Sequence, residues 1–450
     1  MIARSPARRH LVLASLAAIW TVAVVQSISY RETAGVRHYV VHLGWLQGLF
    51  LVLAVFGGAV LLLGILRHRP APGRWRQLPM VSIVIPAKDE VRVIEGAIRS
   101  ACAQAYAGGV EVIAVDDWST DGTGTLLDRL QAELALTVVR TPPGSIGKAE
   151  ALEAGIAASH GEVIAVFDAD ARIAPDLIGR MVPHLADATV AAVQGRRLIY
   201  NARRNILTRF QEDEYRIFQT LLQRARQAVG GFVCLAGNGL IVKRASLRSV
   251  GGWNAQALTE DIDLSVRLTL AGWEIRYCYD AEIWEEGVVT LRDLLRQRER
   301  WFEGALLCFG DYLPRMVVGK MPLLRKADMV FFLSGALVSV LVALTGYVYG
   351  LIRLLHEAVV FIQIPASIMA TASGILTVAL LAAITAEAGW HPGRLGGVLA
   401  RWTLFSFHTL VIVPMAIRRY VYSAITGDRD WRKTAHEGAV ARGGGGPNRG

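Results

Sequence analysis

The sequence contains few cysteines and few charged residues for its length. Only four of the 450 residues are cysteines, and they lie far apart: Cys102, Cys234, Cys278 and Cys308. This spacing excludes a disulfide-rich scaffold and the paired cysteine ligands of a zinc site, so we expect free thiols. Charged residues make up 19% of the chain and hydrophobic residues 53%, which is above the usual share of about 45–50% for soluble domains.

A nucleic-acid recognition motif is also missing. The formal net charge of +10 would suit nucleic-acid binding, but no basic-aromatic repeat or recognition pattern accompanies it. Basic loops that face an anionic lipid leaflet explain the same charge, at about 1 kcal/mol for each Lys or Arg near the surface. We therefore expect membrane lipids, and not nucleic acid, among the partners.

The hydrophobic residues are concentrated in five long runs near the two ends of the chain. Each run meets or approaches the ~20 residues that an α-helix needs to cross a bilayer. They predict transmembrane helices within residues 1–30 and 39–67, and two or three more within 327–420. The alternative for the first run is a cleaved signal peptide, because arginines precede it.

Basic residues around these runs predict the orientation. Arginines precede the first run and follow the second, so the positive-inside rule puts the intervening region in the cytosol of a multi-pass protein of the inner (plasma) membrane. Residues 421–450 are predicted to be a cytosolic, partly disordered tail. The number of C-terminal spans stays open, because the last run could also lie in the membrane interface.

Residues 78–285 alternate between short apolar runs and helical patterns. Strands are predicted at 81–87, within 110–123, at 136–141 and within 161–173, with helices between them. The alternation predicts an α/β fold with a mostly parallel sheet flanked by helices. Ligands bind beyond the carboxyl ends of such strands. Acidic pairs follow three of these strands: Asp89 and Glu90, Asp116 and Asp117, and Asp168 and Asp170.

The stretch DAD at 168–170 carries two carboxylates on alternate residues. In extended backbone Asp168 and Asp170 would point to the same side, so both could face one divalent ion. Hard cations such as Mg²⁺ or Mn²⁺ take carboxylate oxygens and leave ligand places for phosphate. A turn or capping use of Asp is the alternative for an isolated pair.

A second acidic cluster, TEDID at 259–263, begins a predicted helix. Thr259 can cap this helix, and acids are favoured in its first turn. Three acids in four residues, Glu260, Asp261 and Asp263, exceed what capping needs, and a carboxylate can serve as a general base. Gly237 and Gly239, upstream in the chain, predict a close backbone approach to a ligand or a tight turn.

The stretch RQRERW at 296–301 combines three arginines with a tryptophan. A solvated helix face would explain the charges, whereas a site for an anion and a ring-shaped partner would explain the charges and the ring together. The segment 286–326 is expected to contain this motif and helices that lie at the membrane interface.

Six motifs in order resemble the membrane-embedded family 2 glycosyltransferases, which include the synthases of cellulose, chitin, hyaluronan and poly-N-acetylglucosamine. The motifs are VSIVIPAKDE, VDDWSTDGT, GKAEALEAGI, DAD, TED and QRERW. The resemblance implies a GT-A fold for 78–285 and inverting transfer from a nucleotide-activated sugar.

The resemblance also implies roles for individual residues. Asp261 would be the general base, with Glu260 beside it in the substrate site, and Asp168 and Asp170 would hold Mg²⁺ or Mn²⁺ and the nucleotide. The donor pocket would be lined by Pro86, Glu90, Asp116, Asp117 and Lys148. In the QxxRW motif, Arg298 and Arg300 would hold the diphosphate, Gln297 would belong to the substrate site, and Trp301 would form a platform for the acceptor.

Two functions follow from the resemblance. The first is extension of a polysaccharide of the poly-N-acetylglucosamine kind from a UDP-sugar, and the alternative is a single transfer to a membrane lipid such as diacylglycerol. Trp118 and Glu153 stand where the family commonly has a small residue and Asn, so they leave the donor sugar open. Export or accessory subunits also stay open.

Overall fold

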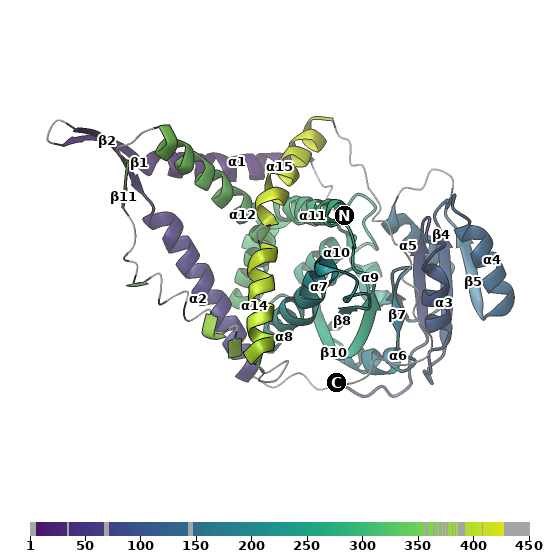
Figure 1. The fold of residues 1–450 in the computed structure, drawn as a ribbon. Coiled ribbons are helices and arrows are strands. Elements are labelled where there is room, and N and C mark those ends of the chain that lie inside the picture. Colours follow the sequence, from purple (N-terminus) through teal and green to yellow (C-terminus); the bar gives the residue numbers. More distant parts are fainter. Residues whose placement is uncertain are drawn as a thin grey trace.

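An eight-stranded mixed sheet forms the centre of the computed structural model (Figure 1). The structure describes residues 6–33, 36–66, 72–142, 147–355 and 359–362, and, with gaps, 365–426. The strand order is β5-β4-β3-β6-β9-β8-β10-β7. The bounds are β3 Val81–Ala87, β4 Val110–Asp116, β5 Leu136–Arg140, β6 Val163–Val166, β7 Arg172–Ile173, β8 Val190–Ile199, β9 Leu240–Lys243 and β10 Glu274–Glu285.

The sheet is parallel over its first four strands and again between β8 and β10, but it is mixed overall. Strands β5, β4, β3 and β6 are parallel, whereas β9 runs antiparallel to both β6 and β8, and β7 is antiparallel to β10. The single strand expected within 161–173 is in fact two, because β6 ends at Val166 and the DAD stretch turns before β7. The carboxylates of Asp168 and Asp170 therefore lie in a turn between two strands and not within the sheet.

Helices cover both faces of the sheet because the strand side chains alternate. Ile83 of β3 packs with helices α3 (Ile94–Cys102) and α4 (Thr123–Glu133), while Val84 packs on the opposite face with α5 (Lys148–Ala157) and α10 (Glu260–Leu270). Both strand residues are fully buried. Each such side chain contributes roughly 1.5–3 kcal/mol on burial, so the sheet is a firm base for the loops at its edge.

The helical segment between β8 and β9 is interrupted by a π-helical turn. It consists of α7 (Ile206–Asp213), a π-helical turn η2 (Glu214–Gln219) and α8 (Thr220–Val229). π-turns inside α-helices are often found at functional sites. Short helices complete the region of residues 78–285: α6 (Leu177–Met181), η1 (Val182–Ala186) and α9 (Arg244–Ser249).

Long helices lie beside the eight-stranded sheet, away from β4 and β5 (Figure 1). The QRERW motif lies in α11 (Leu291–Val318), which packs against α12 (Leu323–Leu355) and α15 (Thr409–Thr426). The other elements on this side are α1 (Pro6–Gln26), α2 (Gly44–Leu66), α14 (Pro392–Ser406) and the sheet of β1 (Ile28–Thr33), β2 (Val36–His42) and β11 (Val359–Ile362).

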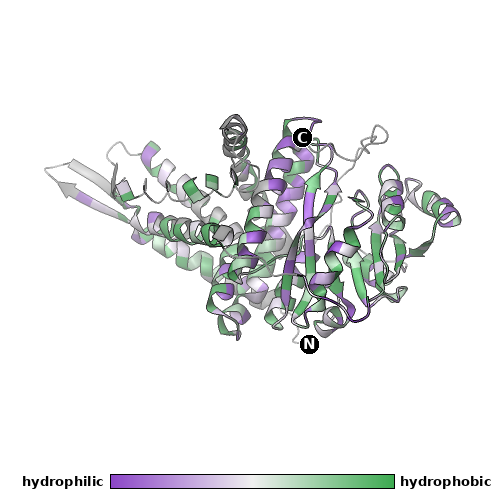
Figure 2. Cartoon of the chain, turned by 90° about the horizontal axis from the view of Figure 1, so that it is seen from below, coloured by the Kyte–Doolittle hydropathy of each residue, from purple (hydrophilic) through white to green (hydrophobic). Residues whose placement is uncertain are grey.

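Within the described part of the chain, no helix combines the length and hydrophobicity that crossing a bilayer requires. The spans expected at 1–30, 39–67 and 327–420 are therefore not found there. Figure 2 shows hydrophobic residues, in green, along the outlying helices, and many of their apolar side chains are exposed on α1, α2 and α12. Of the expected tail at 421–450, residues up to 426 continue α15, and the remainder lies outside the described residues.

Candidate active site

The acidic pairs expected at the strand ends do lie at one edge of the sheet. Strands β3 and β4 end side by side, with Ala87 opposite Asp116, and β6 is the other neighbour of β3. Half-buried Pro86 is the last residue but one of β3, and Asp168 follows β6 by two residues. Parallel pairing thus brings three sequence-distant loops to one rim.

The loops after β3 and β4 are fixed by their own polar groups. Asp117 accepts a hydrogen bond from Thr141 Oγ1 (2.9 Å) and lies 3.8 Å from Lys88 Nζ, and Asp116 accepts the Ser119 N–H (3.1 Å). Both carboxylates are buried. The N–H of half-buried Glu90 donates to Thr123 Oγ1 (2.8 Å). These residues form one rigid wall at the ends of β3 and β4.

Lys148, the first residue of α5, joins the two acidic clusters. Its Nζ lies 2.5 Å from Asp168 Oδ1 and 3.4 Å from Glu260 Oε1, and it donates to the carbonyl of Gly237 (3.0 Å). Burial alone would lower the pKa of Lys148, but the carboxylates of Asp168 and Glu260 raise it, so the ammonium stays charged. Acids about ninety residues apart therefore share one cation.

Asp261 lies beside this lysine and against the glycine turn. A Cβ atom built on Gly237 would come within 3.1 Å of Asp261 Oδ2 and 3.4 Å of Lys148 Nζ. Gly237 also has a φ of +70°, which favours glycine, so the close approach predicted from the sequence occurs here. Burial, followed by the charge of Glu260, raises the pKa of Asp261 to about 6. A carboxylate with a raised pKa is suited to take a proton.

We expect transfer to lose rate as the pH falls below about 6, because a general base works only when it is ionised and the pKa of Asp261 is about 6. Initial rates measured from about pH 5 to about pH 8 would show this fall in rate. UDP binding measured at each pH is the control. A rate that stays constant down to about pH 5 would contradict the assignment.

Two residues beside the DAD stretch, Asn238 and Glu285, were not predicted from the sequence. Asp170 is buried and accepts the backbone N–H of Glu286 (2.8 Å). Asn238 accepts the N–H of Asp168 through Oδ1 (3.1 Å) and donates through Nδ2 to Glu285 Oε2 (2.8 Å). Asn238 stands between two glycines, which was the available signal, whereas nothing in the sequence around Glu285 marks it.

The QRERW side chains point in different directions along α11. Arg298 is buried and makes a bidentate ion pair with Glu214 (2.9 and 2.6 Å), and its guanidinium lies 4.2 Å from the ring centroid of Trp301. Its position therefore differs from the expected diphosphate contact. Arg300 is half-buried, and the buried Oε1 of Gln297 has no hydrogen-bond partner among the described residues. Arg300 thus stays the candidate for binding the diphosphate, and Gln297 stays a candidate substrate-binding residue.

One arginine lies between Trp301 and the acidic rim, which is the group of carboxylates at the strand ends and at the start of α10 (Asp116, Asp117, Asp168, Asp170, Glu260 and Asp261). The guanidinium of Arg197 lies 6.0 Å from the Trp301 ring centroid and 3.6 Å from Glu285 Oε2. Through Glu285 and Asn238 this contact leads to Asp168. The structure therefore brings the Asp168, Asp261 and Trp301 regions to one side of the catalytic domain.

The Arg298–Glu214 pair should affect stability more than any exposed charge of the motif. Arg298→Ala would leave a largely buried Glu214 carboxylate unpaired, which typically costs about 3–5 kcal/mol of unfolding free energy. Arg296→Ala is the matched control. Arg296 is exposed and its ion pair with Asp293 is long, at 3.8 Å, so its loss should change the unfolding free energy by about 0–1 kcal/mol. Thermal unfolding of both variants measures the difference, and equal midpoints would contradict this role.

The oxygen donors at the rim suit a divalent cation that completes its coordination with phosphate. Asp168 and Asp170 offer two hard carboxylates, while no group of three or more His, Cys, Asp or Glu side chains that could hold a metal occurs among the described residues. A cation bound here would need further oxygens from a ligand, as Mg²⁺ usually does.

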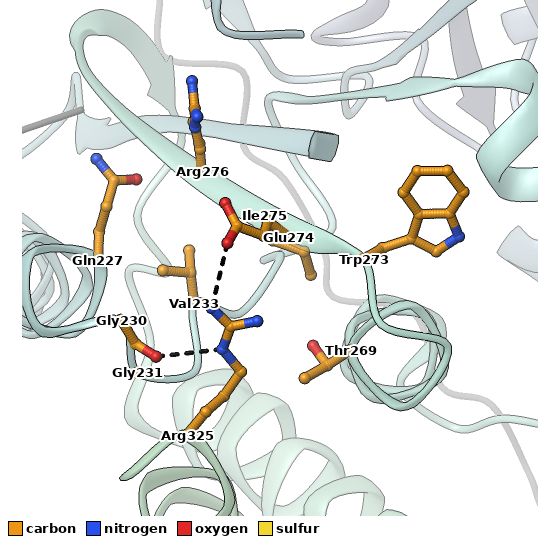
Figure 3. A pocket seen from close by; sticks show the side chains of 10 residues that line it. All are labelled: Gln227, Gly230, Gly231, Val233, Thr269, Trp273, Glu274, Ile275, Arg276 and Arg325. Atoms are coloured by element: carbon orange, nitrogen blue, oxygen red, sulfur yellow. Dashed lines mark hydrogen bonds and ion pairs between the residues drawn. The ribbon is translucent and has the colours of Figure 1, made fainter. Parts of the chain in front are cut away.

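A small cavity at the other end of β10 is a separate feature (Figure 3). It has a volume of about 70 Å³ and is lined by Arg276, Arg325, Trp273 and neighbouring residues. Arg325 pairs there with Glu274 (3.4 Å) and donates to the Gly230 carbonyl (3.1 Å). Glu274 already compensates the charge of Arg325. The acidic rim at the opposite end of β10 is therefore the stronger candidate site.

The chain is similar in sequence to known glycosyltransferases. Residues 79–304 match the family model described as glycosyltransferase like family 2. The chain is 33% identical to a beta-monoglucosyldiacylglycerol synthase of Synechocystis sp. over 97% of this chain and 90% of the relative, and 38% identical to one of Nostoc sp. over 60% of each. A glucomannan 4-beta-mannosyltransferase of Arabidopsis thaliana is 33% identical over 50% of this chain and 42% of the relative.

Among solved structures, a mannosyltransferase from Pyrobaculum calidifontis in complex with GDP-Man and Mn²⁺ has the same fold. It superposes with a TM-score of 0.53 at 20% identity and covers 91% of this chain and 99% of that one. The GT-A fold expected from the sequence is therefore confirmed. The chain belongs to the family 2 glycosyltransferases.

Proposed function

We propose that this glycosyltransferase transfers one glucose residue from UDP-glucose to diacylglycerol, with inversion at the anomeric carbon. The observation that carries the proposal is the 33% identity, across 97% of the chain, with a beta-monoglucosyldiacylglycerol synthase. The expected polysaccharide synthase has less support, because the glucomannan mannosyltransferase of Arabidopsis thaliana matches only half of the chain. The lipid alternative therefore replaces the polymer as the proposed function.

In the proposed reaction, residues of the acidic rim and of the QRERW helix act on opposite sides of the anomeric carbon. The hydroxyl oxygen of diacylglycerol attacks the anomeric carbon while the bond from that carbon to the phosphate oxygen breaks and UDP leaves. Asp261 takes the hydroxyl proton, and its position beside Lys148 and Gly237 keeps it at the rim. Arg300 stabilises the charge that develops on the diphosphate, and Trp301 packs against the acceptor side.

Asp168 and Asp170 would hold Mg²⁺ or Mn²⁺, which would offset charge on the diphosphate when bound. Two carboxylates at the rim support this, as does the Mn²⁺ in the structurally similar mannosyltransferase. The ammonium of Lys148 also lies 2.5 Å from Asp168 Oδ1.

We place this reaction at the cytosolic face of the inner (plasma) membrane. The acceptor is a lipid, and apolar side chains are exposed along α1, α2 and α12. Large exposed apolar patches mark surfaces that bind membranes or other proteins. The net charge of +10 would add attraction to anionic lipids.

Product analysis tests the proposal. The full-length protein is incubated with labelled UDP-glucose and vesicles that contain diacylglycerol, and the label is followed into the organic extract and into high-molecular-weight polymer. Label in a lipid with one hexose supports the proposal. Label in polymer would support the polysaccharide reading, and the absence of either product would overturn both.

Chelation gives a further prediction. EDTA should abolish transfer because the diphosphate would lose its metal, and added Mn²⁺ or Mg²⁺ should restore it. Asp168→Asn is expected to gain little from the added metal. Full activity in excess EDTA would exclude the metal from the reaction.

A further inference from the structure

Strand β8 carries two adjacent buried arginines that have different neighbours. Arg196 and Arg197 follow one another, so their side chains point to opposite faces of the sheet. Both are largely buried, at 6% and 9% exposure. The guanidinium of Arg196 stacks on Tyr279 (4.4 Å) and lies 3.4 Å from Glu282, outside the acidic rim. Arg197 faces the rim.

Arg197 contacts the turn that packs against Asp261. Its Nη1 donates to the carbonyl of Ala236 (2.6 Å), the residue immediately before Gly237. The same turn is held by Lys148, which donates to the Gly237 carbonyl, and by Asn238, which accepts the Asp168 N–H. Gln194 also holds this turn, because its Oε1 accepts the Ala236 N–H (2.8 Å) and its Nε2 donates to the Asn238 carbonyl (2.8 Å). Arg197 is therefore one of several side chains that fix the turn.

Arg197 also contacts the aromatic side of the site. Its guanidinium lies 4.3 Å from the ring centroid of Tyr215, which is in the π-helical turn, and 6.0 Å from that of Trp301. Its Nε lies 3.6 Å from Glu285 Oε2. One planar group thus touches the glycine turn, Glu285 and two rings.

We infer that Arg197 is a positioning residue that aligns the acceptor platform Trp301 with the base Asp261, through its contacts with the Ala236 carbonyl and the Tyr215 and Trp301 rings. This inference rests on the proposed function. A guanidinium is suited to the task because its rigid fork can bond a carbonyl and stack on rings together, which a lysine ammonium cannot do. Arg197 acts through these groups and not on the donor diphosphate.

The test compares Arg197→Lys and Arg197→Gln with Arg196→Gln in the full-length protein. Thermal unfolding, UDP affinity, and kcat and KM for diacylglycerol in mixed vesicles are measured for each. Misplacement of about 1 Å can cost about 10²-fold in rate, so we expect a loss of about that size in kcat/KM for the acceptor in both Arg197 variants. UDP affinity should stay within about 2-fold of the wild type, because no nucleotide contact is removed.

The controls separate positioning from general damage. Arg196→Gln should keep the acceptor kinetics, and Arg197→Lys, which keeps the charge beside Glu285, should unfold near the wild-type temperature while still losing transfer. If Arg197→Lys keeps full acceptor kinetics, or if UDP binding falls in parallel with transfer, the inference is overturned. If the wild type makes no glucolipid, the proposed function fails together with this inference, whereas normal wild-type synthesis with unaffected Arg197 variants overturns the inference alone.

Discussion

Asp261→Asn is expected to lower sugar transfer by about 10²–10⁴-fold, the usual contribution of a positioned general base. The amide is nearly the same size as the carboxylate and can still fit against Gly237, but it cannot accept the acceptor proton. UDP binding should persist, because the nucleotide is assigned to Asp117, Asp168 and the helix that carries Arg300. Single-turnover transfer and UDP titration of the same preparation measure the two effects.

Asp280→Asn is the matched control for this experiment. Asp280 is exposed, lies outside the acidic rim, and undergoes the same chemical change. Its transfer rate should equal that of the wild type. If Asp261→Asn retains wild-type turnover while Asp280→Asn behaves as expected, another group must take the acceptor proton.

Arg300→Ala is expected to lower kcat by about 10²–10³-fold, because a fixed donor that stabilises developing charge in the transition state is typically worth that much. The loss should appear mainly in kcat, since the charge on the departing diphosphate grows as the sugar–phosphate bond breaks. Steady-state kinetics with UDP-glucose measure kcat and KM separately.

Arg296→Ala controls for the removal of one positive charge from the same helix. Arg296 is exposed and forms only a long pair with Asp293, so this variant should turn over normally. Equal kcat values for Arg300→Ala and Arg296→Ala would show that Arg300 does not stabilise the transition state. An unfolding midpoint unchanged in both would exclude loss of structure, in contrast to the destabilisation expected for Arg298→Ala.

The local periodicity of the sequence was enough to predict the strands and the acids at their ends. The run at 81–87 forms β3 with the same bounds, and Asp116 ends β4. Ordered motifs were enough to predict that Asp168 and Asp261 approach one another. These features depend on neighbouring residues or on loops at one sheet edge, which a single sequence records directly.

The sequence could not show which arginine of the QRERW motif would be paired. Glu214, the partner of Arg298, is 84 residues earlier and lies in a π-helical turn that breaks an otherwise regular amphipathic pattern. Nor could it show that β9 reverses direction, because a four-residue buried strand reads the same in either orientation. The hydropathy of the outlying segments likewise predicted spans where the described helices do not qualify as such.

Ion pairs connect the outlying helices to the catalytic helices. Arg401 of α14 pairs with Asp213 at the end of α7, and Arg419 of α15 pairs with Glu303, which follows Trp301 by two residues on α11. Glu303 is almost completely buried, so separation of α15 would strand its charge. Displacement of α15 would consequently disturb the helix that carries the indole, because Glu303 would lose the partner that offsets its charge.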